Sequence, residues 1–311
     1  MNKKHIVIIG LGGVGGYFGF KINQFNEASK LYKITFTARG ETYEKVKKDG
    51  LVLLSPEHSV DHTFPDAVEQ QISSIKDPDL ILICVKEYDL ENVCTQLKQI
   101  IHKNTVLLPM MNGADIYDRI RTIIPDNVIL PTCLYVASHI KQKGIVEHKG
   151  KAGKIIMGRD PQHFSADIDW ITELMKESKI DIDFKDDSLT DIWTKFIFIA
   201  SFGPVTAKYN SSIGTVCTDA QQKHEATEIM KEIKQIAGEK QIRLSGDIIE
   251  KTFEKASAFP FETPTSLQLD IHSGKKDNEL ELFAGAILKY GKELDMETPF
   301  TEKVYNELKG K

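Results

Sequence analysis

The feature that most constrains the fold of this chain is a glycine-rich turn near its start. Residues 5–9, HIVII, form a short apolar and β-branched run, and GLGGVGGYFGFKI follows at once. The glycines stand in G-x-G-x-x-G register after an expected strand and before an expected helix, which predicts a Rossmann-type dinucleotide-binding turn. In such a turn the backbone approaches a pyrophosphate and the helix lies close to the strand. The expected cofactor-binding residues here are Gly10, Leu11, Gly12, Gly13, Val14 and Gly15.

The end of the second expected strand, in KITFTARG, indicates which dinucleotide is bound. Arg39 stands where NAD-specific folds usually carry an acidic residue for the ribose 2′-hydroxyl. A guanidinium suits a 2′-phosphate because it is planar and permanently charged. We therefore predict NADPH as the cofactor. In the alternative interpretation, Arg39 is a solvated residue at the strand end and Glu41 holds the ribose.

Two later segments predict further strands of a parallel sheet. DLILICVKEYD (79–89) and TVLLPMMNGAD (105–115) are apolar runs typical of strands buried on both faces. Lys86 and Asn112 stand within these segments just past the apolar residues, at the strand ends where ligands bind in open parallel sheets. Taken alone, Asn112 with Gly113 is typical of a plain turn. The segment KQKGIVEHKGKA (141–152) predicts a hairpin or loop.

From about residue 188 the pattern changes from strands to helices. DIWTKFIFIASFGPVTA (191–207) is apolar nearly all round, and two amphipathic segments follow at 219–240 and 278–295. We expect an α/β Rossmann domain over residues 1–185 and an all-helical domain over residues 186–311.

Lys195 is the only charged residue between Trp193 and Ala207. Burial of a lone ammonium is costly. Either the lysine stem snorkels so that its head reaches water, or the head is held in a cleft for chemistry.

Composition excludes several classes of protein. A formal net charge of -5 gives no basic excess for a nucleic acid. No apolar run approaches the roughly twenty residues of a membrane span, and we expect a cytoplasmic protein. The four cysteines lack the paired spacing of a zinc site and the nine histidines are scattered, so no metal is expected.

Taken in order, the motifs resemble those of the ketopantoate reductase (2-dehydropantoate 2-reductase) family. The resemblance runs from the first strand to about residue 285. It is carried by GLGGVGG, TARG, VKEYD, MMNGAD, GIVEHKGKAGKIIMG, WTKF with GPVTA, and TSLQLDIHSGKKDNELELFAG. It implies a helical domain of the kind found in 6-phosphogluconate dehydrogenase. It also implies NADPH-dependent reduction of 2-dehydropantoate to pantoate for coenzyme A biosynthesis. A homodimer is expected from this resemblance and from no other feature of the sequence.

The resemblance implies that Lys195 is the catalytic lysine and Glu279 the glutamate on the substrate side. The chemistry suits the lysine independently. Hydride transfer to a ketone builds negative charge on its oxygen, which a positioned ammonium can stabilise and then protonate. This reaction favours the interpretation in which the Lys195 head faces a cleft.

Four further residues match family positions. Ser266 matches the serine that meets the substrate carboxylate, and Asn112 matches the asparagine near the nicotinamide and the carbonyl. Arg39 matches the arginine at the 2′-phosphate, and Lys86 matches the lysine after the fourth strand.

Two departures from the family pattern concern the substrate. Ile199 and Gly203 stand where the family usually has asparagines, so either Ser201 or the backbone at Gly203 replaces these amides, or the substrate differs. The segment before Glu279 is also one residue longer than usual, so Asp277 is an alternative to that glutamate.

Three functions remain open from the sequence. The first is ketopantoate reductase, and the second is an NADPH-dependent reductase of another 2-oxo acid, which Ile199 and Gly203 favour. The third is a non-catalytic NADPH sensor. The joint presence of Lys195, Ser266 and Glu279 argues against a sensor, because a sensor needs none of them.

Overall fold

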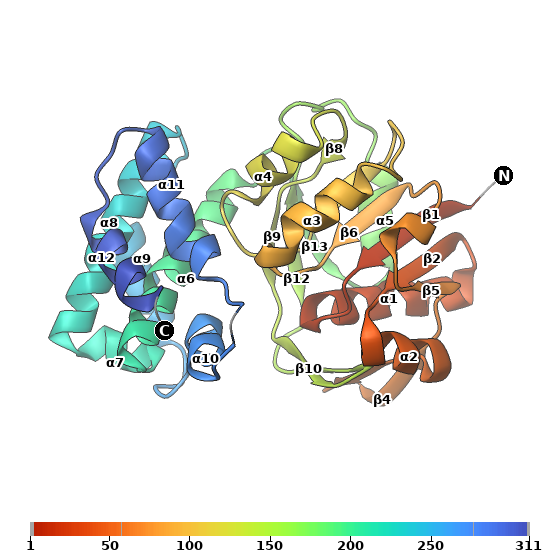
Figure 1. Cartoon of the computed structure of the whole chain (residues 1–311), viewed down its shortest axis with the longest axis horizontal. Helices are drawn as coiled ribbons and strands as arrows, with labels where there is room; N and C mark the ends of the chain where they lie inside the picture. The colour runs from red at the N-terminus through yellow and green to blue at the C-terminus, as the bar shows by residue number, and fades with distance from the viewer. Residues whose placement is uncertain (1–2, 57, 276, 310–311) are drawn as a thin grey trace. The chain divides into compact units, whose positions relative to one another are not determined.

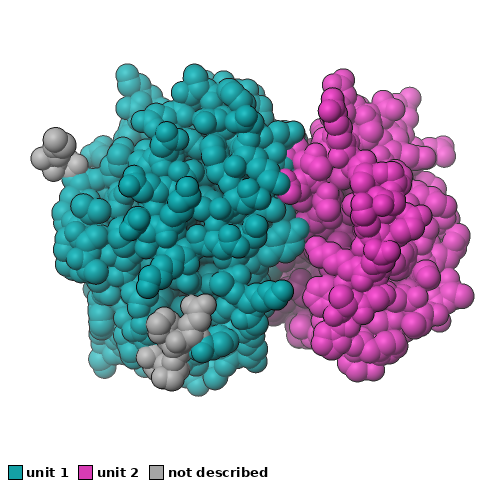
Figure 2. All heavy atoms as spheres, turned by 180° about the vertical axis from the view of Figure 1, so that it is seen from behind, with its two compact units in different colours: residues 1–111, 116–188 teal, residues 112–115, 189–311 magenta. Residues whose placement is uncertain are grey.

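The computed structural model describes residues 3–56, 58–275 and 277–309. The chain divides into two compact units, which Figure 2 colours separately. The first unit comprises residues 1–111 and 116–188, and the second comprises residues 112–115 and 189–311. The short segment 112–115, which follows a strand of the first unit, thus belongs with the second unit. The sequence did not predict that residues 112–115 group with the helical unit.

The first unit is built on a parallel six-stranded sheet with the order β5-β2-β1-β6-β7-β8 (Figure 1). Its strands are β1 Lys4–Ile9, β2 Tyr32–Thr37, β5 Ala67–Glu69, β6 Leu80–Ile83, β7 Val106–Pro109 and β8 Val128–Ile129. The strand order reverses between β1 and β6, which pair directly. In sheets of this kind, ligands bind beyond the carboxyl ends of the strands at such a reversal.

The sheet forms because its central strands are apolar on both faces. Ile6 and Leu80 lie on one face and Val7 and Ile81 on the other, and all four are fully buried. The helices of this unit are α1 Gly13–Ser29, α2 Gly40–Asp49, α3 Glu87–Leu97, α4 Ile116–Ile123 and α5 Asp169–Glu177, with a 3₁₀ turn at Ile72–Ser74.

Two smaller sheets complete the first unit. The expected hairpin is present, because β10 (Ser138–Gln142) pairs with β11 (Ile145–His148) in antiparallel fashion around Gly144, whose φ is 77°. The second sheet contains β3 Leu51–Ser55, β4 His58–Thr63, β10 Ser138–Gln142 and β11 Ile145–His148. The third sheet contains β9 Thr132–Tyr135, β12 Lys154–Gly158 and β13 Asp181–Lys185. Helix α1 contacts both the main sheet and the second sheet.

The second unit is helical, and among its described residues none is in a strand (Figure 1). Its helices are α6 Leu189–Tyr209, α7 Ile213–Thr218, α8 Ala220–Glu239, α9 Ile248–Ser257, α10 Ser266–His272, α11 Ala286–Glu293 and α12 Pro299–Leu308. The apolar segment around Lys195 is the long helix α6. The predicted fold class, an α/β Rossmann domain followed by a helical domain, is confirmed.

One expected helix differs in detail. The segment 278–295 contains a π-helical turn, Glu281–Gly285, before α11 begins. A Cβ atom at Gly285 would lie 2.4 Å from Oε2 of Glu281. The same carboxylate accepts a hydrogen bond from the Tyr305 hydroxyl. The wide turn thus carries a contact with α12, which lies outside the local pattern of apolar residues.

A buried carboxylate network fastens α4, the helix that follows segment 112–115. Asp160, which is 1% exposed, accepts hydrogen bonds from the Tyr117 hydroxyl at 2.7 Å and the Ile129 N–H at 2.9 Å. The Arg121 guanidinium lies 2.5 Å from Asp160. Burial alone would raise the pKa of Asp160, but the hydrogen bonds from Ile129 and Tyr117 outweigh it and lower the pKa below its usual value.

We predict that Asp160→Asn lowers the free energy of unfolding by about 3–5 kcal/mol at neutral pH, because the buried Arg121 loses its counter-charge. Urea unfolding measures this change. Because the folded-state pKa of Asp160 is depressed, its contribution is present above about pH 4 and is lost as pH falls through the folded-state value. The exposed Asp126→Asn is the matched control and should change stability by less than about 0.5 kcal/mol. Equal effects of the two substitutions would contradict this prediction.

Candidate active site

The glycine turn has the backbone geometry of a dinucleotide-binding loop. Gly10 follows β1 with φ at 92°, a left-handed conformation that favours glycine. Its N–H donates to the Thr37 hydroxyl at the end of β2, with N and Oγ1 3.1 Å apart. Gly12 precedes the first turn of α1, and a Cβ atom there would meet nothing within 4 Å. The turn therefore leaves open space beside the helix N-terminus, as a pyrophosphate requires.

The other glycines of this segment serve packing. A Cβ atom at Gly15 would lie 2.0 Å from the Gly10 carbonyl oxygen and 2.8 Å from Cβ of Cys84. At Gly13 it would lie 2.3 Å from the Ser138 carbonyl oxygen on β10. We infer that Gly13 is glycine because β10 lies against it, a reason that the turn motif did not indicate.

A cavity of about 560 Å³ lies at the strand reversal of the first unit. Of the predicted cofactor-binding residues, five line it: Gly10, Leu11, Gly12, Arg39 and Lys86. Gly13, Val14 and Gly15 belong to α1 and are not among its lining residues. Cys84 also lines the cavity, and burial raises the pKa of its thiol, so it stays protonated and adds no charge at neutral pH.

The part of this cavity that Arg39 lines contains a residue that the sequence reasoning missed. Arg39 lines the cavity, whereas Glu41, its alternative, is not among the lining residues. Asp89 also lines the cavity, and its Oδ1 atom is 3.5 Å from Nη1 of Arg39. The signal for Asp89 was its place three residues after Lys86, in the first turn of α3. A guanidinium and a carboxylate therefore face the same space.

In the second unit, the structure brings together two predicted residues that are far apart in sequence. Nζ of Lys195 on α6 donates to Oδ1 of Asn112 at 2.7 Å. Both side chains are half-buried. This contact joins segment 112–115 to α6, in agreement with the grouping of that segment with the helical unit. The Lys195 ammonium is thus held by a side-chain partner, and its role in chemistry stays a prediction.

The two candidate carboxylates near residue 279 differ in their exposure to solvent. Glu279 is 5% exposed, whereas Asp277 is exposed. Glu279 lies two residues before the π-helical segment, and its carbonyl oxygen accepts from the Phe283 N–H at 3.2 Å. Glu279 is therefore the carboxylate held within the helical unit.

The two predicted serines differ in what they offer to a ligand. Ser266 is exposed at the first residue of α10. Ser201, in contrast, is fully buried, and its hydroxyl donates to the Ile197 carbonyl oxygen of its own helix at 2.6 Å. The expectation that Ser201 replaces a missing amide is therefore wrong, because the α6 backbone already takes its hydroxyl.

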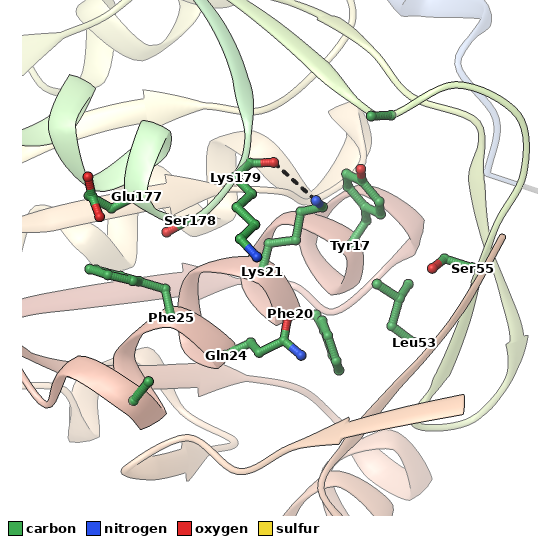
Figure 3. A pocket seen from close by; sticks show the side chains of 12 residues that line it. Tyr17, Phe20, Lys21, Gln24, Phe25, Leu53, Ser55, Glu177, Ser178 and Lys179 are labelled. Carbon is green, nitrogen blue, oxygen red and sulfur yellow. Dashed lines mark hydrogen bonds between the residues drawn. The ribbon is translucent and has the colours of Figure 1, made fainter. Parts of the chain in front are cut away.

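A second cavity in the first unit, of about 520 Å³, lies along later turns of α1 (Figure 3). Tyr17, Phe20 and Leu53 give it an apolar lining. The Lys21 ammonium at its side donates to the Lys179 carbonyl oxygen at 3.1 Å. It contains none of the predicted site residues, so the candidate site is elsewhere.

Two searches of the described residues returned nothing. Within residues 3–56, 58–275 and 277–309, no group of three or more His, Cys, Asp or Glu side chains could hold a metal ion. Over the same ranges, no helix is long and apolar enough to cross a bilayer.

The fold and the glycine turn define a Rossmann-type dinucleotide-binding protein with a helical second unit. Within that class, the chain belongs to the ketopantoate reductase family and is an oxidoreductase of that family. The family model "Ketopantoate reductase PanE/ApbA" matches residues 6–162, and "Ketopantoate reductase PanE/ApbA C terminal" matches residues 187–311. The resemblance stated from the sequence is confirmed.

Individual relatives match over nearly their whole length. An uncharacterized oxidoreductase of Bacillus subtilis, YkpB, is 24% identical over 97% of both chains. The 2-dehydropantoate 2-reductase of Aquifex aeolicus is 24% identical over 98% of this chain and 96% of its own.

Solved structures share the fold at similar identity. The 2-dehydropantoate 2-reductase of Porphyromonas gingivalis W83 superposes with a TM-score of 0.83 at 24% identity and covers 99% of both chains. D-mandelate dehydrogenase, in a ternary structure with NADH and anilino(oxo)acetate, also gives a TM-score of 0.83. Its identity is 20%, with 98% of this chain and 97% of that chain covered. Substrates within this fold therefore differ.

We predict opposite outcomes for alanine at two glycines of the turn. Gly15→Ala should lower the free energy of unfolding by about 1–3 kcal/mol or more, because its Cβ would overlap the Gly10 carbonyl. Gly12→Ala should leave stability within about 0.5 kcal/mol, because its Cβ would enter open space. Denaturant unfolding of the two variants measures both effects. A Gly15→Ala protein as stable as Gly12→Ala would refute the packing argument.

Proposed function

We propose that the protein is an NADPH-dependent reductase of a small 2-oxo acid. The first candidate reaction is reduction of 2-dehydropantoate to pantoate, as in coenzyme A biosynthesis. The observation that carries the proposal is the hydrogen bond between Lys195 and Asn112, which holds an ammonium in a fixed direction. Family membership supports it, because the family is named for this reaction.

Lys195 is the proposed general acid. When bound, the reduced nicotinamide supplies the hydride and its electron pair to the ketone carbon. The carbonyl oxygen then gains negative charge, which the Lys195 ammonium stabilises before it donates a proton to form the hydroxyl. Lys195 regains a proton from water. Asn112 is the proposed positioning partner, because its Oδ1 accepts one N–H of the ammonium and so directs Nζ.

The cavity of the first unit is the proposed NADPH site. The residues present fit this cofactor. The open space at Gly12 and the N-terminus of α1 suit the pyrophosphate, and the Arg39 guanidinium suits the 2′-phosphate. Lys86, beyond the end of β6, adds a second positive charge to the lining.

Two residues of the helical unit are proposed substrate contacts. Ser266 presents an exposed hydroxyl that can donate to the substrate carboxylate. Glu279 is the proposed acceptor on the substrate side, supported by its burial within the unit. Ser201 is not included, because its hydroxyl is taken by Ile197.

A second candidate substrate is a 2-oxo acid without a hydroxyl group. On α6, the positions four and eight residues after Lys195 are Ile199 and Gly203, which offer no side-chain hydrogen bond. A substrate hydroxyl placed against them would lose its hydrogen bonds to water, which disfavours ketopantoate. This observation favours a substrate with a hydrocarbon tail.

The first test compares ketopantoate with 3,3-dimethyl-2-oxobutanoate, which lacks only the 4-hydroxyl, by following NADPH oxidation with NADH in parallel. A kcat/KM for ketopantoate well above that of its analogue supports the pantoate reaction. Equal or lower values support the second candidate. NADPH binding without turnover of either acid or of pyruvate would indicate the sensor and contradict the proposed reaction.

We predict that Lys195→Ala lowers kcat about 10²–10⁴-fold on the preferred acid, because the developing oxyanion loses its proton donor. The Kd for NADPH should stay nearly unchanged. Steady-state kinetics and a nucleotide titration measure the two quantities. Lys231→Ala, which removes an exposed lysine from α8, is the matched control and should leave kcat unchanged. An unimpaired kcat in Lys195→Ala would exclude Lys195 from the mechanism.

A further inference from the structure

The Arg39–Asp89 pair lies at one end of the cavity proposed for the cofactor. Arg39 follows β2 and precedes the first residue of α2, and Asp89 is in the first turn of α3. Their charged atoms are 3.5 Å apart, and the side chains are 64% and 35% exposed. Both remain accessible to a ligand, so the pair is not a sealed structural contact.

Asp89 differs in charge from the other charged residues that line the cavity. Arg39, Lys86 and Lys143 contribute positive charge to the lining. Among the described residues that line the cavity, Asp89 is the only carboxylate. The positive charges of the lining therefore favour an anionic ligand, and the Asp89 carboxylate opposes this preference.

Arg39 and Asp89 have opposite preferences at a ribose. A guanidinium favours a 2′-phosphate, whereas a carboxylate favours a 2′-hydroxyl and repels a phosphate. The carboxylate also draws the guanidinium toward itself and partly neutralises it. Each effect weakens the binding of a 2′-phosphate, and neither weakens the binding of a 2′-hydroxyl.

We propose that Asp89 is a specificity-determining residue that restrains the preference for NADPH over NADH set by Arg39. This inference rests on the proposed function, since it assumes that the cavity binds a nicotinamide dinucleotide. The wild-type protein then binds both nucleotides with affinities that differ less than Arg39 alone would allow.

The test is a fluorescence titration of the protein with NADPH and with NADH, which reports Kd without substrate or turnover. In Asp89→Asn the Kd for NADPH should fall about tenfold at low ionic strength, because one repulsive charge is removed near a partly exposed site. The Kd for NADH should stay the same or rise. The gain for NADPH should shrink in high salt, since salt screens the repulsion.

Two further variants separate this effect from general changes in charge or folding. Glu91→Gln removes one negative charge from the same helix at an exposed position outside the cavity lining, and it should change either Kd less than twofold. Asp89→Ser removes the charge with a side chain suited to a first helical turn, and it should reproduce the effect of Asp89→Asn.

An unchanged ratio of the two Kd values in both Asp89 variants, with both nucleotides bound by the wild type, would overturn the inference and leave the proposed function intact. A gain of equal size in Glu91→Gln would also overturn it, because the effect would then be one of net charge. If the wild type binds neither nucleotide at millimolar concentration, the proposed function and this inference both fail.

Discussion

The rest of the first unit depends on the packing of helix α1 between two sheets. On one side Gly15 lies against the Gly10 carbonyl and Cys84, and on the other Gly13 and Gly16 lie against β10 and β11. Any side chain at these three positions would overlap neighbouring atoms, so the helix approaches both sheets closely only because it has none. This contact fixes the N-terminus of α1 beyond β1 and thereby shapes the cavity proposed for the cofactor.

The fold could be predicted because its signals are local. The β-branched run before Gly10 and the apolar run at 79–89 each specify a buried strand without information from elsewhere in the chain. The apolar segment around Lys195 likewise specifies a buried helix. The π-helical turn at Glu281–Gly285 was not predicted, because the apolar spacing of 278–295 fits an ordinary α-helix and gives no sign of the contact between Glu281 and Tyr305 of α12.

The candidate site was only partly predictable, because its contacts join distant parts of the chain. The sequence indicated Lys195 and Asn112 separately, but nothing local places segment 112–115 with the helical unit. Asp89 was missed because its significance comes from Arg39, which stands fifty positions earlier, between β2 and α2. Ser201 was assigned wrongly because a serine within a helix can turn its hydroxyl to its own backbone, as it does here.

The positions of these residues indicate which substitutions the fold can accept and which it cannot. Gly13, Gly15 and Gly16 act through the absence of side chains, and a substitution at any of these three positions disturbs the packing of α1. Arg39 and Asp89 lie at the edge of the same cavity and are partly exposed, so their replacement leaves the core unchanged. On α6, Ile199 is half-buried beside a fixed Lys195. If the proposed roles hold, cofactor preference and substrate preference can change through a few side chains while the proposed proton donor and the glycine turn stay in place, so one fold can serve different substrates.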